Sequence, residues 1–466
     1  MKTTTNAKYK TVSINYISIA VAIGGLLFGF DTAVISGAIT FVTAQFSLDS
    51  IAEGWLVSSG LLGCIIGVAI TGLASDRIGR KRTVILAGIL FLVSAVGCAF
   101  APTFATLVAA RLIGGIGVGM ASVISPMYIS EFAPAEKRGS LVAYYQLAIT
   151  AGILLAYFSN ALLVHFSQHD FSSRMMTWFF VEETWRPMFL VMAIPSLIFL
   201  GMLLRVPESP RWLVWTGKKD QATAVLKSVR TPKEALQEIE ALDNAKQKTE
   251  KRKIRLSDPR IRLPLFTGIT LAVLQQFSGI NAIIYYGPRI FQSAGMEADN
   301  ALAFQIVIGS VNLLFTFVAI KYADKYGRKF LLKTGLGGII FSLFALGALF
   351  HWGYTEGVVL LVLMLLFIAC FAFSLGPITW IIINEIFPTD LRVKLVSICT
   401  MSLWVAVWLV GQFFPWLLDY AGAAATFWTF GFFSVINFVF SWKVVKETKG
   451  KTLEEVERVW HVGGSH

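Results

Sequence analysis

The chain has 466 residues, of which 56% are hydrophobic and only 15% carry a charge. A water-soluble domain of this length needs a larger share of charged side chains on its surface, so the composition indicates a membrane protein. We interpret the net charge of +12 as a signal of membrane topology, and not as the footprint of a nucleic-acid or acidic-substrate partner.

Apolar stretches of about 20 residues recur along the chain, and each is long enough to cross roughly 30 Å of hydrocarbon as a helix. A helix satisfies its own backbone polar groups inside lipid, so the pattern predicts an all-α membrane protein. Twelve transmembrane helices are predicted in chain order, at residues 13–37, 53–75, 83–101, 104–131, 139–163, 187–206, 263–292, 301–322, 330–350, 357–387, 393–418 and 424–444.

One long polar stretch separates the sixth predicted span from the seventh. It contains Thr231-Pro232-Lys233-Glu234, which combines a capping residue, a proline at the first helical position and a glutamate at the third, so we expect short helices there. The predicted domains are a six-helix half at 1–206, a helical linker domain at 207–261, a second six-helix half at 262–446 and a tail at 447–466.

The basic residues orient these spans. With an even number of spans both termini lie on one side of the membrane, and that side receives every Lys and Arg except Arg111, Arg174, Arg186 and Arg289. Because an excess of Lys and Arg marks the cytoplasmic side, we expect a multi-pass protein of the cell membrane with both termini in the cytoplasm.

Two motifs occur once in each half, in the same order. The D-x-x-G-R-K pattern at 76–81 returns at 324–329, and the E-x-x-P-x-x-x-R pattern at 131–138 returns at 385–392. Such an internal repeat, in two halves of a membrane bundle, is typical of transporters that open alternately to the two sides.

The charged residues of these motifs lie at the predicted cytoplasmic ends of the spans. An Asp ends one helix and basic residues begin the next, which is unfavourable for both helix dipoles, so we expect charge partners elsewhere. Ion pairs between the halves would hold this side shut and break when it opens. The alternative is a set of ordinary positive-inside loops. The predicted gate residues are Asp76, Arg80, Glu131, Arg138, Glu208, Arg211, Asp324, Arg328, Glu385 and Arg392.

The seventh predicted span is rich in amide side chains. On an unbroken helix Gln275 and Asn281 would point about 240° apart, at roughly 100° per residue. Both can face one site only if the helix is unwound between them, and Gly279 permits this. The alternative role of these amides is hydrogen bonding between helices.

Asp31 and Arg111 each lie in an otherwise apolar span. An ionisable residue inside a span is costly and usually functional. At about 1.5 Å per residue both fall in the outer half of the membrane, so they can meet. An Asp beside an Arg stays ionised, and a buried Asp whose Arg has moved away takes up a proton, so the pair is a candidate proton switch. The alternative is a structural ion pair that never titrates.

No pattern in the chain predicts a metal site, a cofactor site or an enzyme. The four cysteines (Cys64, Cys98, Cys370 and Cys399) lie within spans, at no metal-binding spacing. The glycine-rich run at 114–119 resembles a dinucleotide fingerprint, but it lies inside a span, where close helix packing is the expected role.

Further motifs indicate a family. They are P-E-S-P-R-W-L at 207–213, Q-Q-F-S-G-I-N at 275–281, G-P-I-T-W at 376–380 and K-E-T-K-G-K-T-L-E-E at 446–455. Together with the two repeats they resemble the sugar porter family of the major facilitator superfamily, over nearly the whole chain. The resemblance implies uptake of monosaccharides by rocking of the two six-helix halves around a central site.

The resemblance also implies which residues bind the sugar. Amides both donate and accept hydrogen bonds, and aromatic rings cover the apolar faces of a sugar. Sugar-contacting positions of the family are matched by Gln146, Gln275, Gln276, Asn281, Tyr285, Asn312 and Trp380, and aromatic pocket positions by Phe28 and Trp404.

Two further comparisons with the family bear on coupling and specificity. Its proton symporters carry residues that match Asp31 and Arg111, and many passive facilitators carry Asn at the Asp position. Proton-coupled relatives often have polar amides beside the tryptophan that matches Trp404, where this chain has Leu403 and Val407. The particular sugar is therefore not predicted.

The predicted function is proton-coupled uptake of a pentose or hexose, such as D-xylose or D-glucose. The expected partners are this sugar, a proton and the lipid bilayer, with no nucleic acid, no cofactor and a monomeric state. A passive facilitator with the same pocket is the alternative. A sugar sensor that transports nothing is a third hypothesis, which the short predicted tail at 447–466 disfavours.

Overall fold

The computed structural model describes residues 13–134, 138–251, 259–294, 298–354, 357–387 and 391–449. Within these ranges every regular element is a helix, which confirms the predicted all-α class.

The first half contains five long helices and a sixth span made of two shorter ones. In chain order these are α1 (Ile14–Phe46), α2 (Ser50–Ile78), α3 (Arg80–Ala99), α4 (Phe104–Phe132), α5 (Arg138–Phe166), α7 (Trp185–Leu190) and α8 (Ala193–Leu203). Between α5 and α7 lie α6 (Arg174–Thr177) and the π-helix η2 (Trp178–Glu182), two helical turns that the sequence did not predict.

The polar stretch after the first half forms short helices, as expected. They are α9 (Pro210–Trp215), α10 (Lys219–Val229) and α11 (Pro232–Lys251). The predicted cap begins α11, because the Thr231 backbone N–H donates to the Glu234 carboxylate over 3.1 Å and the Glu234 N–H donates to the Thr231 hydroxyl over 3.4 Å.

The second half contains two interrupted spans. Its helices are α12 (Pro259–Gln276), α13 (Ile280–Ser293), α14 (Ala298–Tyr326), α15 (Arg328–Trp352), α16 (Gly357–Phe373), α17 (Leu375–Glu385) and α18 (Arg392–Lys443). The seventh span is α12 followed by α13, and the tenth is α16 followed by α17. The long α18 is two arms joined by a bend at Gly422, which has a φ of 80°.

The number of membrane crossings agrees with the prediction. The described residues contain 11 helical stretches that are long and apolar enough to cross a membrane, and the last of them, Lys394–Lys443, holds both arms of α18. Counting these two arms separately gives the twelve predicted spans.

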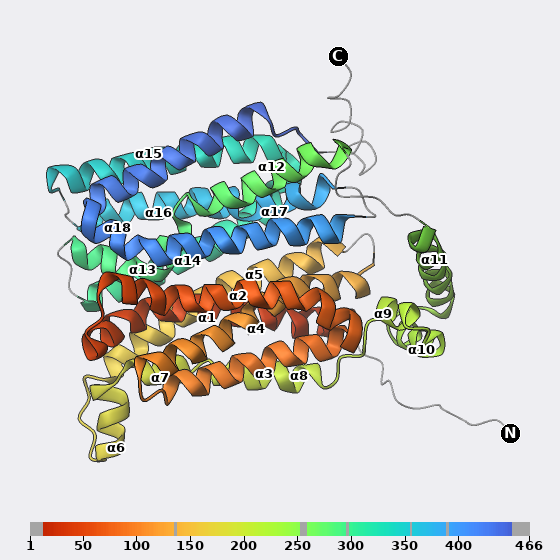
Figure 1. The fold of residues 1–466 in the computed structure, drawn as a ribbon, viewed down its shortest axis with the longest axis horizontal. Helices are drawn as coiled ribbons and strands as arrows, with labels where there is room; N and C mark the ends of the chain where they lie inside the picture. Colours follow the sequence, from red (N-terminus) through yellow and green to blue (C-terminus); the bar gives the residue numbers. More distant parts are fainter. Residues whose placement is uncertain are drawn as a thin grey trace.

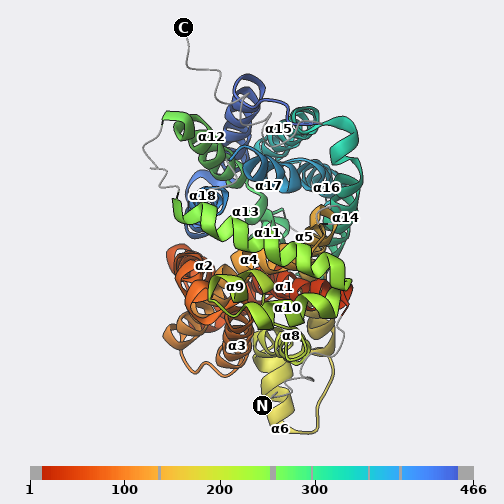
Figure 2. The same ribbon diagram turned by 90° about the vertical axis from the view of Figure 1, so that its right-hand side faces the viewer.

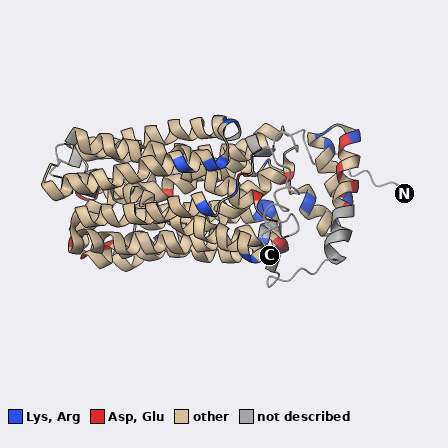
Figure 3. Cartoon of the chain, turned by 90° about the horizontal axis from the view of Figure 1, so that it is seen from above, with Lys and Arg blue, Asp and Glu red and all other residues tan. Residues whose placement is uncertain are grey.

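The two halves lie side by side, with the short helices at one end. Figure 1 shows α1–α8 in one layer and α12–α18 in the other. Figure 2 looks onto the end that carries α9, α10 and α11, with α11 lying across it. We call this the linker end. Lys and Arg are concentrated toward the linker end, and the flanks of the spans carry few charges (Figure 3).

Glycines set the spacing between neighbouring spans in the first half. A Cβ on Gly115 of α4 would lie 1.8 Å from the backbone oxygen of Gly60 on α2, and one on Gly119 would lie 2.2 Å from that of Cys64. The glycine-rich run therefore serves close helix packing, as the sequence predicted.

Gly115→Ala is expected to destabilise the protein by about 1–3 kcal/mol, because its methyl group has no space unless α2 and α4 move apart. Thermal unfolding of the purified protein in detergent measures this. The matched control is Gly72→Ala on α2, where a Cβ meets nothing within 4 Å. Equal unfolding temperatures for the two variants would contradict the packing role.

Candidate functional site

The two ionisable residues predicted to meet inside the bundle are in contact. Asp31 on α1 and Arg111 on α4 are each 3% exposed. Nη1 of Arg111 donates to Oδ1 of Asp31 over 3.2 Å and to its backbone oxygen over 3.3 Å. Glycines make room for the pair, since a Cβ on Gly60 would lie 3.2 Å from the guanidinium and one on Gly114 would lie 3.4 Å from the carboxylate.

This ion pair has few supporting contacts. Nε of Arg111 is buried and has no hydrogen-bond partner among the described residues. The guanidinium lies 5.7 Å from the centroid of the Phe189 ring. A buried ion pair repays its desolvation only when further hydrogen bonds satisfy the remaining donors. With one donor unsatisfied, this pair separates at a lower cost than a fully bonded one.

The seventh span is unwound where the sequence predicted. α12 ends at Gln276 and α13 begins at Ile280. Gly279, between them, has a φ of 87°, and a Cβ there would lie 2.6 Å from the Phe430 ring. Both the backbone conformation and the close ring therefore require glycine.

The break brings together amides from both of its sides. Nδ2 of Asn281 donates to Oε1 of Gln276 over 2.5 Å, and Nε2 of Gln276 donates to Oε1 of Gln275 over 3.1 Å. Nε2 of Gln275 donates in turn to the backbone oxygen of Leu375 over 2.6 Å, at the start of α17. We call Gln275, Gln276 and Asn281 the amide chain. It connects the interrupted seventh span to the interrupted tenth.

The other candidates for sugar contact lie on several helices around the amide chain. Phe28 on α1 and Trp404 on α18 meet across the two halves, with ring centroids 5.5 Å apart. No hydrogen bond or ring contact between described residues joins the rest to the amide chain. These are the buried Tyr285 (α13) and Asn312 (α14), and the partly buried Gln146 (α5) and Trp380 (α17).

At the linker end, the first copy of the repeated motifs forms one cluster. Nε of Arg80 donates to Oε1 of Glu131 over 3.4 Å. Oε1 of Glu208 accepts two backbone N–H groups at the start of α3, over 2.9 and 3.1 Å, and so caps that helix. The Ser209 hydroxyl donates to the Glu131 carboxylate and closes the cluster.

The second copy has the same arrangement. Nη2 of Arg328 donates to Oε1 of Glu385 over 2.8 Å. Glu447 accepts two backbone N–H groups at the start of α15, both over 3.0 Å, and the Thr448 hydroxyl donates to Oε2 of Glu385 over 2.6 Å. Residues 447 and 448, at the start of the predicted tail, thus bond to α15 and α17 of the second half.

Glu208-Ser209 and Glu447-Thr448 thus form a third repeat, which the sequence analysis did not identify. Its signal is a Glu followed by a hydroxyl residue shortly after the last span of each half. The repeat explains why basic residues are tolerated at the starts of α3 and α15. Neither helix has a side-chain cap of its own, and a carboxylate from a distant segment takes that place.

The gate charges were predicted to pair between the halves when this side is shut, and the pairs that the described residues form lie within single halves. Arg80 pairs with Asp76 and Glu131, and Arg328 pairs with Glu385, each within one half. Arg211 lies 5.1 Å from the centroid of the Trp215 ring. The side chains of Arg138, Asp324 and Arg392 lie outside the described residues.

The ion pairs that cross between the halves lie at the opposite end of the bundle. Arg289 on α13 pairs with Glu53 on α2, and its Nη2 lies 3.0 Å from Oδ1 of Asp419 on α18. The Ser50 hydroxyl also donates to Asp419. We call Glu53, Arg289 and Asp419 the opposite-end triad. The distribution of basic residues places Arg289 on this side of the membrane, but the sequence does not predict its partners.

A second cross-half contact lies deeper along the same helices. Gln412 on α18 accepts from the Ser58 hydroxyl over 2.5 Å and donates to the Ile51 backbone oxygen over 3.2 Å. A Cβ on Gly54 would lie 2.2 Å from the Gln412 backbone oxygen, so α2 and α18 touch here.

Comparisons with known proteins agree with the sequence patterns. The family model described as "Sugar (and other) transporter" matches residues 17–460. The arabinose-proton symporter of Bacillus subtilis (strain 168) is 40% identical over 445 residues, which cover 95% of this chain and 94% of that protein. The D-xylose-proton symporter of Escherichia coli (strain K12) is 39% identical over an alignment of 492 residues, which covers 98% and 97%.

A solved structure extends the likeness to the fold. The partially occluded inward open conformation of the xylose transporter XylE from E. coli is similar with a TM-score of 0.82 and 36% identity, and the match covers 94% of this chain and 99% of that one.

The Glu447 cap gives a testable pH dependence. Burial raises the pKa of Glu447, but its carboxylate accepts hydrogen bonds from backbone N–H groups. These hydrogen bonds outweigh the effect of burial and hold the pKa below the ordinary glutamate value. Such a group stabilises the folded state at neutral pH, and the contribution is lost as the pH falls through the lowered pKa. Glu447→Gln is expected to cost roughly 1 kcal/mol at neutral pH and nothing in strong acid.

Thermal unfolding of both proteins across a pH series measures this difference. Glu240→Gln, which alters an exposed carboxylate on α11, is the control and should match the wild type throughout. A deficit of the Glu447 variant that is the same at every pH would contradict the cap.

The opposite-end triad predicts a conformational effect. Arg289→Gln leaves Glu53 and Asp419 as neighbouring carboxylates without their cation, so the two halves should separate at this end. Spin labels at the exposed Ala44 and Tyr420, in a background without the four buried native cysteines, should report a longer distance in the variant. Arg174→Gln, at an exposed arginine on α6, is the control, and an unchanged distance in the Arg289 variant would refute the closing role.

Proposed function

We propose that this chain, which belongs to the sugar transporter family, imports a monosaccharide together with a proton by alternating access. The observation that carries the proposal is the buried contact between Asp31 and Arg111. An ion pair inside a membrane bundle is costly, and such groups commonly mark proton relays and ion pathways. Two relatives, an arabinose-proton symporter and a D-xylose-proton symporter, support it.

The proposed orientation places the linker end, and both termini, in the cytoplasm. The excess of Lys and Arg at this end supports this orientation (Figure 3). In it, the opposite-end triad faces the exterior of the cell membrane, and the conformation described above is closed to the exterior.

Alternating access then exchanges one set of contacts for another. In the closed-outside state the triad and the Ser58–Gln412 contact hold the halves together. Opening to the exterior breaks these contacts and brings the linker ends together. The linker-end clusters would then exchange some of their ion pairs within a half for pairs between halves, which is the gate role proposed for the repeated motifs.

The coupling step lies in the first half. While Arg111 contacts Asp31, the carboxylate remains ionised. When α1 and α4 shift and the guanidinium withdraws, the buried carboxylate lacks a counter-charge and takes up a proton from the open side. The proton is released when the pair forms again, so protonation is linked to which state the halves adopt.

The sugar is proposed to bind between the halves, at the amide chain and at the contact between Phe28 and Trp404. The amides offer donors and acceptors to the hydroxyl groups, and the two rings offer apolar faces. Gln146, Tyr285, Asn312 and Trp380 complete the proposed set. Because Phe28 and Trp404 belong to different halves, a sugar between them contacts both and can favour one state over the other.

Asp31→Asn tests the coupling. The amide cannot ionise, so the variant should lose accumulation of sugar against a gradient in proteoliposomes while it retains exchange of sugar across the membrane. The control is Asp170→Asn, at an exposed carboxylate after α5, which should leave both activities unchanged. If the Asp31 variant accumulates sugar as well as the wild type, the chain is a passive facilitator or couples through another residue.

The identity of the sugar is a separate question. Leu403 and Val407 are buried beside Trp404 and offer no hydrogen bond. A site that lacks a partner for one hydroxyl discriminates strongly between related sugars. Competition of pentoses and hexoses against labelled D-xylose and D-glucose, with and without a pH gradient, identifies the preferred substrate.

A further inference from the structure

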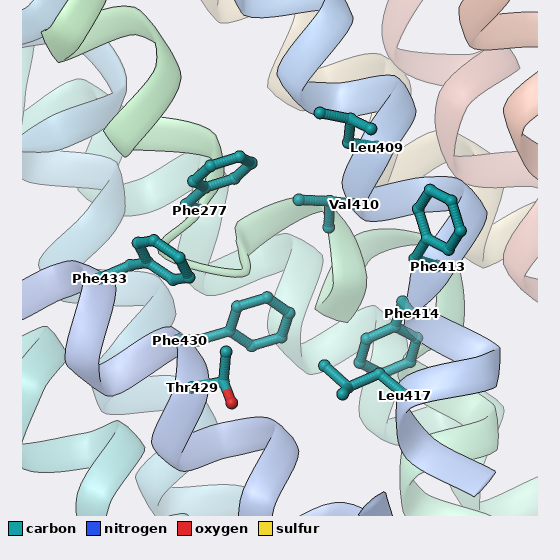
Figure 4. Close-up of a pocket in the computed structure, with 9 residues that line it drawn as sticks. All are labelled: Phe277, Leu409, Val410, Phe413, Phe414, Leu417, Thr429, Phe430 and Phe433. Atoms are coloured by element: carbon teal, nitrogen blue, oxygen red, sulfur yellow. The ribbon is translucent and has the colours of Figure 1, made fainter. Parts of the chain in front are cut away.

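An apolar hollow lies behind the break in the seventh span, apart from the proposed sugar site. It has a volume of about 220 Å³ and no polar surface. None of the residues proposed to bind sugar or proton lines it (Figure 4). Its walls are Phe277 at the break, Leu409, Val410, Phe413, Phe414 and Leu417 on the first arm of α18, and Thr429, Phe430 and Phe433 on the second arm.

The lining excludes water and sugar as occupants. The single hydroxyl in it, that of Thr429, donates to the backbone oxygen of Ala425 over 2.8 Å, so it offers the hollow no free donor. A water needs two to four polar partners in such a space, whereas an apolar cavity of about 150 Å³ stays dry and accepts an apolar molecule. The occupant that fits is therefore hydrocarbon.

The hollow lies beside an exposed apolar face of α18. Val405, Leu409, Phe413 and Leu417 follow one another at four-residue intervals and form one face of the first arm of α18. On this face Val405 is 41% exposed and Phe413 is 47% exposed. A side chain that is exposed on the part of a membrane-spanning helix within the hydrocarbon layer contacts acyl chains. Phe413 lies nine residues before the bend at Gly422, about 13 Å along the helix and so within the hydrocarbon layer.

The inner wall of the hollow belongs to the hinge of the seventh span. The Phe430 ring fills the space over Gly279, where a Cβ would lie 2.6 Å from it. Phe430 stacks on Phe414 at 6.2 Å between centroids, and Phe414 stacks on Tyr286 of α13 at 5.0 Å. A molecule in the hollow thus lies directly behind the aromatic side chains that pack against the break.

We propose that the hollow is a binding site for one acyl chain of a bilayer phospholipid. The chain enters between the two arms of α18 and packs against Phe413 and Phe433 on the outside and against Phe430 on the inside. The lipid becomes part of the wall that supports the unwound segment at Gly279. This proposal does not depend on proton coupling or on which sugar is carried.

Photo-crosslinking tests the site directly. The full chain is placed in nanodiscs that contain a phosphatidylcholine with a diazirine midway along one acyl chain, irradiated, and mapped by mass spectrometry. Adducts at 409–417 and 429–433 are expected to exceed those on the exposed face of α16 at Val358, Val359 and Val362 several-fold. That face reports ordinary contact with surrounding lipid.

A filled pocket supplies the matched comparison. Val410→Phe places a ring in the hollow and should reduce its adducts to the level of the α16 face, while Val362→Phe on that face should leave them unchanged. The proposal is overturned if the wild type shows no enrichment, or if Val410→Phe leaves the enrichment intact. If wild-type nanodiscs hold two copies of the protein and Val410→Phe nanodiscs hold one, the hollow binds a second copy of the protein instead of a lipid.

Discussion

Inside a membrane every backbone N–H and C=O group must find its partner within the protein, and the two interrupted spans meet this constraint together. The Gln275 side chain donates to the backbone oxygen of Leu375, so an amide beside the break in the seventh span bonds the backbone at the break in the tenth. The same hydrogen-bonded chain continues through Gln276 to Asn281. Gln275, one of the groups proposed to bind sugar, thus also satisfies backbone oxygens at the break in the tenth span. A sugar can replace the mutual bonds of the amide chain with its own hydroxyl groups.

Symmetry and asymmetry have different roles in the molecule. The linker-end clusters obey the internal repeat, with Arg80, Glu131 and Glu208 in one half matched by Arg328, Glu385 and Glu447 in the other. The ion pair of Asp31 and Arg111 has no described counterpart in the second half, and the amide chain has none in the first. The repeat supplies two similar bodies that can move against each other. The differences between them place the proposed proton pair in one body and most of the proposed sugar contacts in the other.

The sequence predicted the fold well because its signals are strong and local. Apolar length located the spans, and Gly279 between amides located the break. The meeting of Asp31 with Arg111 was predictable from depth alone, since two charges at one level of a bundle have little else to pair with. Charge and spacing do not say whether the partner of a linker-end charge lies in the same half, and the pairs that the described residues form do lie within one half. The opposite-end triad and the cap at Glu447 join residues more than a hundred positions apart, and only the folded structure brings them together.

Proton movement during sugar uptake tests the central claim most directly. In an unbuffered suspension of cells that express the protein, without an external energy source, addition of a transported sugar should make the medium more alkaline as each sugar carries a proton inward. The same cells carrying Asp31→Asn should give no pH change. Sugar entry at full rate without any alkalinisation in the wild type would contradict proton coupling and leave a passive facilitator with the same site.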